Sequence, residues 1–132
     1  MNIMSGSILI IEASMLLENL VRYLKAKDWT IHKVREQKDI INLLKKKSID
    51  VVLLNLSDLK NEGIALIKII KKEFPLIQII TVNSGDQIHL SIEGMKSGVF
   101  FDYIMPLDVD SLITKISEAY QMKLKYDNKL IY

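Results

Sequence analysis

The sequence contains no cysteine in its 132 residues. Disulfide bonds, thiolate catalysis and cysteine-ligated metal sites are therefore excluded. Histidine is almost as scarce: His32 and His89 are far apart in the sequence and have no further ligand residues beside them. A metal site built on histidine is therefore not expected.

Long hydrophobic runs are also missing, because lysine and aspartate interrupt every apolar stretch before it reaches membrane-spanning length. The first residues, 1–7, have neither the basic region nor the long apolar core of a signal peptide. We therefore expect a cytoplasmic protein without a membrane partner.

The excess of positive over negative charge is small, with a formal net charge of +2. This excess is too small to indicate nucleic-acid binding by itself. The lysine runs at 45–47 and 71–72 fall at the ends of expected helices. Lysines there complement the negative end of the helix dipole, so a solvated face is favoured over a nucleic-acid patch.

Glycine is absent from the stretch that follows the first apolar run, where Ile11 is followed by Glu-Ala-Ser-Met-Leu-Leu. A glycine-rich phosphate loop would be expected there in a nucleotide- or flavin-binding relative. The remaining composition, 49% hydrophobic and 26% charged, is typical of one globular domain.

The most informative stretch that is present is the apolar run 51–56, Val-Val-Leu-Leu-Asn-Leu. A short run rich in branched residues predicts a strand buried on both faces, as in parallel sheets covered by helices. Ligands of such sheets bind at the carboxyl ends of the strands. Asn55 lies at that end and is the first candidate site residue.

Strands and helices are predicted to alternate along the whole chain, which indicates an α/β fold with a five-stranded parallel sheet and helices on both faces. The strand at 29–34 is less apolar and is expected near the sheet edge. A polar loop is expected at 57–63. Ser14 and Asp108 are the expected N-caps of the first and last helices. The other expected strands are 8–11, 77–82 and 100–105, and helices are expected from about 14 to 27, near 40–44, from 64 to before Pro75, from 86 to Gly98 and from 108 onward.

Three of the predicted strands end in polar side chains, namely Glu12, Asn55 and Asn83. Because parallel strands end at one edge of the sheet, these residues are expected to converge on one crevice.

Several motifs together resemble the receiver domain of two-component response regulators, over roughly residues 7–120. Ile8 to Glu12 resembles the family's first strand with its acidic end, and Asp50 to Leu56 resembles the strand that carries the phosphorylated aspartate; the order and spacing of all the motifs together carry the resemblance. Glu62-Gly63 stands where the family has Asp-Gly, Ile92 to Gly98 resembles the helix that ends in Ala-Gly, and Met105-Pro106 stands where the family has Lys-Pro. The resemblance implies the flavodoxin-like (βα)5 receiver fold.

The resemblance also implies a phosphoryl-transfer site, in which two acids hold Mg²⁺ and an aspartate accepts the phosphoryl group. A Ser or Thr and a lysine then contact that group. In this sequence Glu12 and Ala13 stand at the acidic pair and Asn55 at the phosphoacceptor. Asn83 stands at the Ser/Thr position if no gap is placed, and Thr81 would stand there after a shift of two residues.

Met105 stands at the lysine position, and its bond to Pro106 is expected to be cis, as is usual in the family. Asp102 replaces the family's aromatic switch residue. These losses predict a degenerate receiver, or pseudo-receiver, with no cofactor and with Mg²⁺ binding that is absent or, through Glu12, weak. Ser57, Asp58 and Ser84 lie near the expected crevice and are less favoured substitute phosphoacceptors.

The expected function is therefore that of a non-enzymatic signalling domain that works through protein–protein interaction. The partner would be a signalling protein, an output domain or a second copy, bound through the face formed by residues 86–121. Nucleic acid would be reached only through an output domain outside this chain. Two alternatives stay open: a receiver phosphorylated at a displaced residue, and a small-ligand module on the same fold.

Residues 1–7 are expected to form an N-terminal extension and residues 8–120 the receiver-like domain. Residues 121–132 would either extend the last helix or begin a linker.

Overall fold

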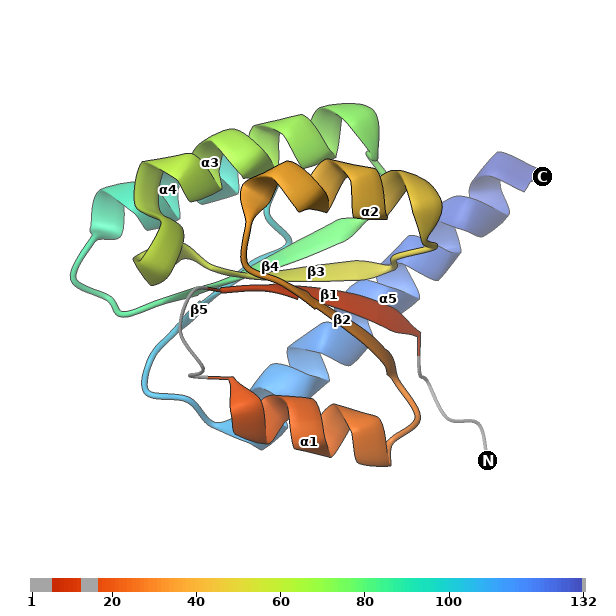
Figure 1. Cartoon of the computed structure of the whole chain (residues 1–132), viewed down its shortest axis with the longest axis horizontal. Helices are drawn as coiled ribbons and strands as arrows, with labels where there is room; N and C mark the ends of the chain where they lie inside the picture. Colours follow the sequence, from red (N-terminus) through yellow and green to blue (C-terminus); the bar gives the residue numbers. More distant parts are fainter. Residues whose placement is uncertain (1–5, 13–16, 132) are drawn as a thin grey trace.

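The computed structural model describes residues 6–12 and 17–131, apart from the side chains of residues 37 and 128–131. Strands and helices alternate along the described chain (Figure 1). The elements are β1 (Ser7–Ile11), α1 (Glu18–Ala26), β2 (Thr30–Val34), the 3-10 turn η1 (Gln37–Asp39), α2 (Ile40–Lys46), β3 (Val51–Asn55), α3 (Leu56–Glu73), β4 (Gln78–Asn83), α4 (Ile88–Lys96), β5 (Phe101–Ile104) and α5 (Val109–Ile131).

The five strands form one parallel sheet in the order β2-β1-β3-β4-β5. Every residue of β3 is buried, because this strand lies in the middle of the sheet and is covered on both faces. β2 lies at an edge, and none of its residues is fully buried. The predicted α/β class, the buried central strand and the edge position of 29–34 are confirmed.

Helices cover both faces of the sheet (Figure 1). Alternate residues of the strands point to opposite faces, so the core is divided into two apolar clusters. One cluster joins β1, β3 and β4 to α2, α3 and α4, and includes Leu9, Leu54 and Ile67. The other joins the opposite face to α1 and α5, and includes Ile10 and Leu112.

The prediction of a polar loop at 57–63 is wrong, because α3 begins at Leu56. The Asn55 side chain caps this helix by accepting a hydrogen bond from the Asp58 backbone N–H at 3.3 Å. The helix is kinked at Lys60, whose φ of 53° and ψ of −128° are not helical. Polar composition indicated a loop, but buried Leu56 anchors the segment and makes its first turn amphipathic.

The kink brings the backbone of Gly63 close to the first turn of the helix. A Cβ at Gly63 would lie 2.9 Å from Leu56 Cδ1 and 3.1 Å from Leu59 Cβ. A side chain at Gly63 would therefore force Leu56 and Leu59 to shift.

Lys60→Gly is expected to raise the free energy of unfolding by about 1 kcal/mol, because the backbone at Lys60 is in a region that glycine enters without strain. Urea unfolding followed by circular dichroism measures this change. The control is Asn61→Gly, one residue further along α3, which is expected to lower the same free energy by about 0.5–1 kcal/mol. A lower free energy of unfolding in Lys60→Gly would contradict the inference that the backbone at Lys60 is strained.

Two predicted helix ends are confirmed. Asp108 caps α5 by accepting hydrogen bonds from the backbone N–H groups of Asp110 and Ser111, at 3.1 and 3.4 Å. Gly98, with a φ of 104°, ends α4. The predicted cap Ser14 lies outside the described residues.

The last helix, α5, continues to Ile131 and extends past the end of the sheet (Figure 1). Long as it is, neither α5 nor any other helix in the described part of the chain is apolar enough to cross a membrane.

Candidate functional site

The carboxyl ends of β1, β3 and β4 lie side by side at one edge of the sheet. In the strand register Ile11 is the partner of Leu54, and Asn55 is the partner of Val82. The three polar residues at these strand ends are Glu12, Asn55 and Asn83. Their exposed fractions are 1%, 1% and 0%, so their polar groups depend on partners within the protein.

Glu12 and Asn55 are bonded to each other. The Asn55 Nδ2 donates to Glu12 Oε1 at 3.4 Å, and the Leu17 backbone N–H donates to Glu12 Oε2 at 3.2 Å. The Asn55 Oδ1 is the acceptor that caps α3. The Asn55 amide therefore donates an N–H to the Glu12 carboxylate, which directly follows β1, and its oxygen caps the start of α3.

Burial raises the pKa of the Glu12 carboxyl above its ordinary value, because removal from water penalises the charged form. The hydrogen bonds from Leu17 and Asn55 and the charge of Lys33 oppose this shift, while the charge of Asp58 adds to it. The net direction is upward, so the native state holds this proton at a higher pH than the unfolded chain does.

This shift has a sign that can be measured. A raised carboxyl pKa means that the native state is penalised as pH rises through the ordinary glutamate value, near 4.3, toward the higher folded value. We expect the free energy of unfolding of the wild type, relative to Glu12→Gln, to fall between pH 4 and pH 7. Urea unfolding of both proteins across this range gives the difference. If the free energy of unfolding of the wild type instead rises relative to that of Glu12→Gln between pH 4 and pH 7, the raised pKa of Glu12 is contradicted.

Asn83 belongs to a second hydrogen-bonded group beside the first. Its Oδ1 accepts from the Ser57 hydroxyl at 3.5 Å and from the Gly85 N–H at 3.3 Å, and its Nδ2 donates to Ser91 Oγ at 2.8 Å. The Ser57 hydroxyl also accepts from the Ser84 N–H at 2.7 Å. These bonds fix the loop after β4 against the start of α3.

Thr81, the alternative to Asn83, is not part of this group. Its hydroxyl donates to Asp102 Oδ1 on β5 at 2.6 Å. Asp102, which the resemblance is expected to place at the aromatic switch position, therefore accepts a hydrogen bond from the neighbouring strand β4.

Met105 lies at the end of β5, where its backbone N–H donates to the Asn83 carbonyl oxygen at 2.8 Å. Its side chain packs against the apolar cluster that joins the sheet to α1 and α5. The Met105–Pro106 peptide bond is cis. Ala13, which is expected at the second acidic position, lies outside the described residues.

The structure also explains the contacts of the candidate substitute phosphoacceptors. The Ser57 hydroxyl is bonded to Asn83 and Ser84, and the Ser84 hydroxyl donates to Asp86. Sequence reasoning missed the Leu17 N–H and Ser91 as partners of the site. Only the fold brings them there, because neither is part of a local motif. Within the described residues, no three acidic or histidine side chains are grouped so as to hold a metal ion.

A separate feature of the surface is an apolar stripe on α4. Ile88, Ile92 and Met95 are spaced so that they share one face of the helix, and they are 66%, 50% and 49% exposed. Ile104 on the neighbouring strand β5 is 48% exposed. Exposed large apolar side chains that gather in one place indicate an interaction surface.

Comparison with known proteins identifies the family and supports the fold. A family model described as the response regulator receiver domain matches residues 8–117. The chain belongs to this family. As a receiver domain it is a module of two-component signalling.

Among curated proteins, this receiver domain is 30% identical over 92 residues to a putative NtrX-like response regulator of Rickettsia typhi. The match covers 67% of this chain and 19% of that protein, so the chain spans about a fifth of its relative.

Among solved structures, a CheY-like receiver domain of Methanospirillum hungatei superimposes with a TM-score of 0.82 at 17% identity, covering 92% of this chain and 98% of that one. The beryllofluoride-activated NtrC4 receiver domain dimer gives a TM-score of 0.79 at 15% identity, with coverage of 89% and 98%. At these identities the likeness shows the fold.

Proposed function

We propose that this chain is a pseudo-receiver, a receiver domain that has lost the aspartyl-phosphate switch and works by binding a protein. The observation that carries the proposal is the buried bond between Asn55 and Glu12. An amide has no nucleophilic oxygen comparable to a carboxylate, so a residue of this kind at the phosphoacceptor position does not attack a phosphoryl donor.

The neighbouring groups support the same proposal. Mg²⁺ prefers carboxylate, phosphate and water oxygens, whereas here Asn55 turns its N–H toward the single carboxylate of Glu12. This donor set does not fit the metal. Met105, at the lysine position, packs as an apolar side chain and has no charge with which to neutralise a phosphoryl group. Without the carboxylates, a lysine at this position would be a buried cation without a partner, which is costly. Loss of the lysine therefore agrees with loss of the carboxylates.

The proposed binding face is the one predicted at residues 86–121, and the apolar stripe of α4 with Ile104 is its best-supported part. A receiver domain of known structure, that of NtrC4, is described as a dimer. We infer that this chain uses its stripe to bind a second copy or a signalling protein. In the absence of a phosphoryl group, the sequence or the partner sets the conformation.

Ile92→Glu is expected to abolish self-association without unfolding the domain, because the side chain is half exposed and the change places a charge in the stripe. Sedimentation equilibrium over a range of concentrations measures the association. The matched control is Ile69→Glu on α3, 42% exposed and outside the stripe, which should associate like the wild type.

Adding beryllofluoride and Mg²⁺ to the wild type in the same experiment separates the proposed function from an ordinary receiver. The pseudo-receiver is expected to show no change in association. Association that depends on beryllofluoride, or equal loss in both variants, would contradict the proposal. A wild type that stays monomeric would leave a different signalling protein as the partner.

A further inference from the structure

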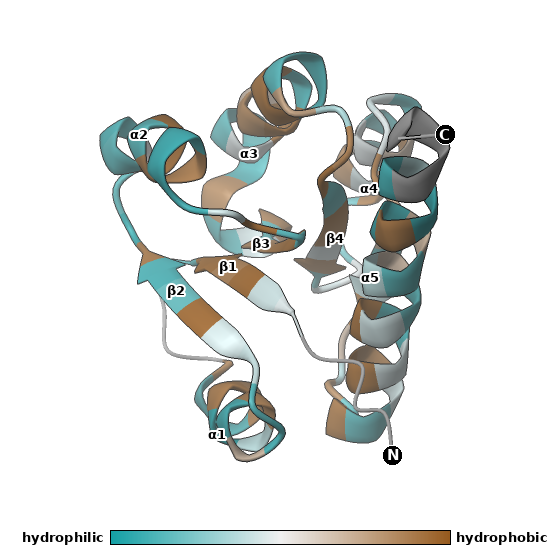
Figure 2. Ribbon diagram, turned by 90° about the vertical axis from the view of Figure 1, so that its right-hand side faces the viewer, coloured by the Kyte–Doolittle hydropathy of each residue, from teal (hydrophilic) through white to brown (hydrophobic). Residues whose placement is uncertain are grey.

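A groove lies at the opposite end of the molecule, where the strands begin. Its cavity volume is about 510 Å³, and its floor and walls are mainly apolar. Figure 2 views the molecule from this end, with the ends of α2 and α3 above β3 and β4, and α5 to the right. We call it the base groove; it is lined by Leu44, Lys47, Ser48, Ile49, Phe74, Pro75, Leu76, Ile77, Lys123 and Asp127.

One wall is the loop 75–77, which is held by Lys71. The ammonium group of Lys71 donates to the Pro75 and Ile77 carbonyl oxygens, both at 3.0 Å. Gln78 adds a bond from its side-chain amide to the Leu76 carbonyl oxygen at 3.1 Å. The loop is therefore fixed by side chains at both of its ends, so the groove is built into the fold.

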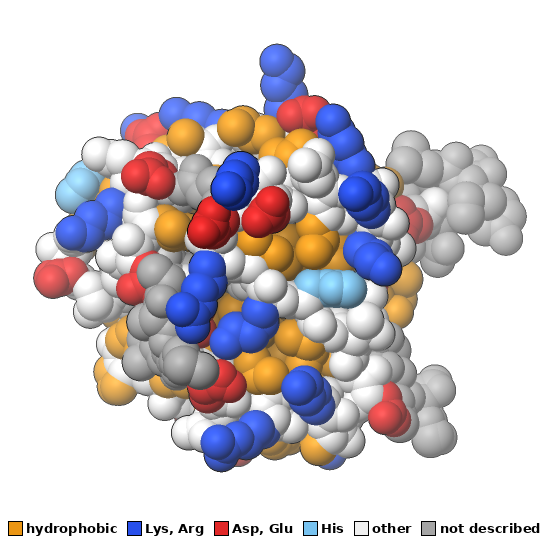
Figure 3. All heavy atoms as spheres, viewed as in Figure 1, with side chains coloured by type: hydrophobic (Ala, Val, Ile, Leu, Met, Phe, Trp, Pro, Cys, Tyr) orange, Lys and Arg blue, Asp and Glu red, His pale blue; other side chains and the backbone are white. Residues whose placement is uncertain are grey.

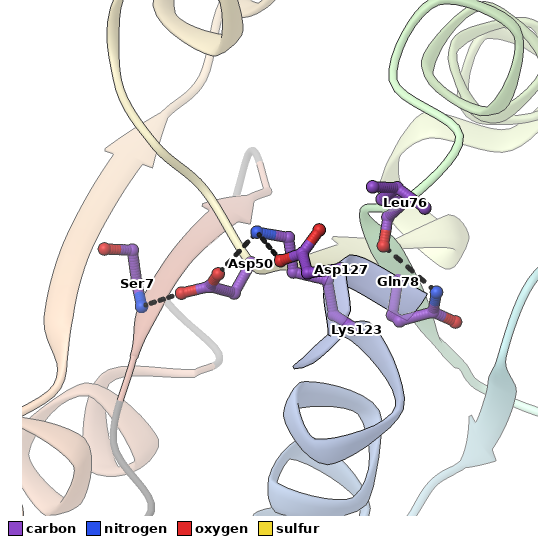
Figure 4. A network of polar contacts seen from close by, with 6 residues as sticks. All are labelled: Ser7, Asp50, Leu76, Gln78, Lys123 and Asp127. Atoms are coloured by element: carbon purple, nitrogen blue, oxygen red, sulfur yellow. Dashed lines mark hydrogen bonds and ion pairs between the residues drawn. The ribbon is translucent and has the colours of Figure 1, made fainter. Parts of the chain in front are cut away.

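The facing wall is the extension of α5, which is anchored by an ion pair. Figure 4 shows Lys123 between Asp50 and Asp127. Its Nζ lies 2.9 Å from Asp50 Oδ1 and 3.3 Å from Asp127 Oδ2, and the Ser7 backbone N–H donates to the other Asp50 oxygen at 2.9 Å. Lys123 and Asp50 are 14% and 15% exposed. Partial burial makes such a pair less screened by salt than a surface pair.

The chain segments that supply the lining of the base groove are rich in lysine, although only Lys47 and Lys123 line the groove itself. Residues 44–50, 71–77 and 123–127 contain seven lysines and three carboxylates, although the whole chain has a net charge of only +2. Two of those carboxylates already pair with Lys123, while Lys47 is exposed at the rim. On the face seen in Figure 3, by contrast, both signs of charge are interspersed around small hydrophobic patches.

We propose that the base groove binds an acidic amphipathic segment of a partner protein, with its apolar side chains in the groove and its carboxylates toward Lys47. An apolar concave site of several hundred cubic ångströms suits one or two aliphatic or aromatic anchors. The exposed charge of Lys47 at the edge of the groove adds attraction to an acidic partner and disfavours a basic one.

Other occupants fit these observations less well. A second copy that offered the same surface would bring lysines against lysines, which is unfavourable. Nucleic acid would use the lysines but would leave the apolar groove unfilled. The proposal is independent of the pseudo-receiver site and of the α4 stripe, which lie on other parts of the molecule.

The test uses the whole chain and three fluorescein-labelled synthetic peptides of twelve residues. The first combines Leu and Phe anchors with glutamates, the second replaces the glutamates by lysines, and the third replaces the anchors by serines. Fluorescence anisotropy measures affinity, and backbone amide NMR shifts locate the contact. Only the first peptide is expected to bind, with shifts at Ser48, Ile49, Leu76 and Ile77. Its affinity should weaken as salt is raised.

Lys47→Glu is expected to weaken binding of the first peptide at least fivefold. The matched control is Lys96→Glu, which makes the same charge change at an exposed lysine near the end of α4 and should change the affinity less than twofold. Equal binding of the lysine or serine peptide, shifts confined to α4, equal effects of both variants, or displacement by a single-stranded oligonucleotide would overturn the proposal.

Discussion

Asn55→Asp is expected to lower the free energy of unfolding by about 3 kcal/mol at pH 7. The new carboxylate would replace the amide that now lies 3.4 Å from Glu12. At an effective dielectric constant of about 20, two charges at this distance repel by roughly 5 kcal/mol, and protonation of one carboxyl limits the cost. Because the native state then binds a proton that the unfolded chain has released, the loss should shrink as pH falls toward 4.

Asn83→Asp provides the control for this prediction, because it makes the same change at an equally buried position. Its oxygen already has two donors, Ser57 and Gly85, and the Ser91 hydroxyl can rotate to become a third. Urea unfolding between pH 4 and pH 7 should therefore show a smaller loss in Asn83→Asp. Equal losses would mean that burial alone, and not the Glu12 carboxylate, sets the cost.

The second large expected effect is that phosphorylation can be restored by substitution. The triple variant Ala13→Asp, Asn55→Asp, Met105→Lys is expected to accept a phosphoryl group from acetyl phosphate in the presence of Mg²⁺. The three changes supply a second metal-binding acid, the nucleophilic carboxylate and the neutralising cation on a receiver sheet that already has the family's order. Intact-mass spectrometry detects the added phosphoryl group.

The controls are the single variant Asn55→Asp and the double variant without the lysine, which are expected to show little or no adduct. Omitting Mg²⁺ should remove the adduct from the triple variant. An adduct on the single variant as strong as on the triple would mean that the other two losses do not matter. A folded triple variant without adduct would mean that the site geometry has also diverged.

Much of the fold could be predicted because its signals are local. The buried strand at 51–55, the less buried edge strand at 30–34 and the Asp108 cap each follow from a few neighbouring residues. The start of α3 could not be predicted in this way. Its polar residues favour a loop, and the helix forms because Asn55 caps it and Leu56 anchors it in the core. Tertiary contacts decided this segment, as they often override intrinsic preference.

The sequence predicted which residues lie at the candidate site. It did not predict the hydrogen bonds between them. Alternation of strands and helices indicated that Glu12 and Asn55 would lie at one edge of the sheet. The bond between them depends on side-chain rotation and on the Asp58 N–H that fixes the amide oxygen. The pairing of Lys123 with Asp50 spans 73 residues and has no local signal. Such contacts require the folded chain.

The most direct test of the central claim is the intact mass of the wild-type chain after incubation with acetyl phosphate and Mg²⁺. The pseudo-receiver account predicts no added phosphoryl mass, because Asn55 is not a nucleophile and Met105 gives no cation. A stable adduct of one phosphoryl group would contradict the account. Peptide mapping would then decide among Ser57, Asp58 and Glu12 as the acceptor.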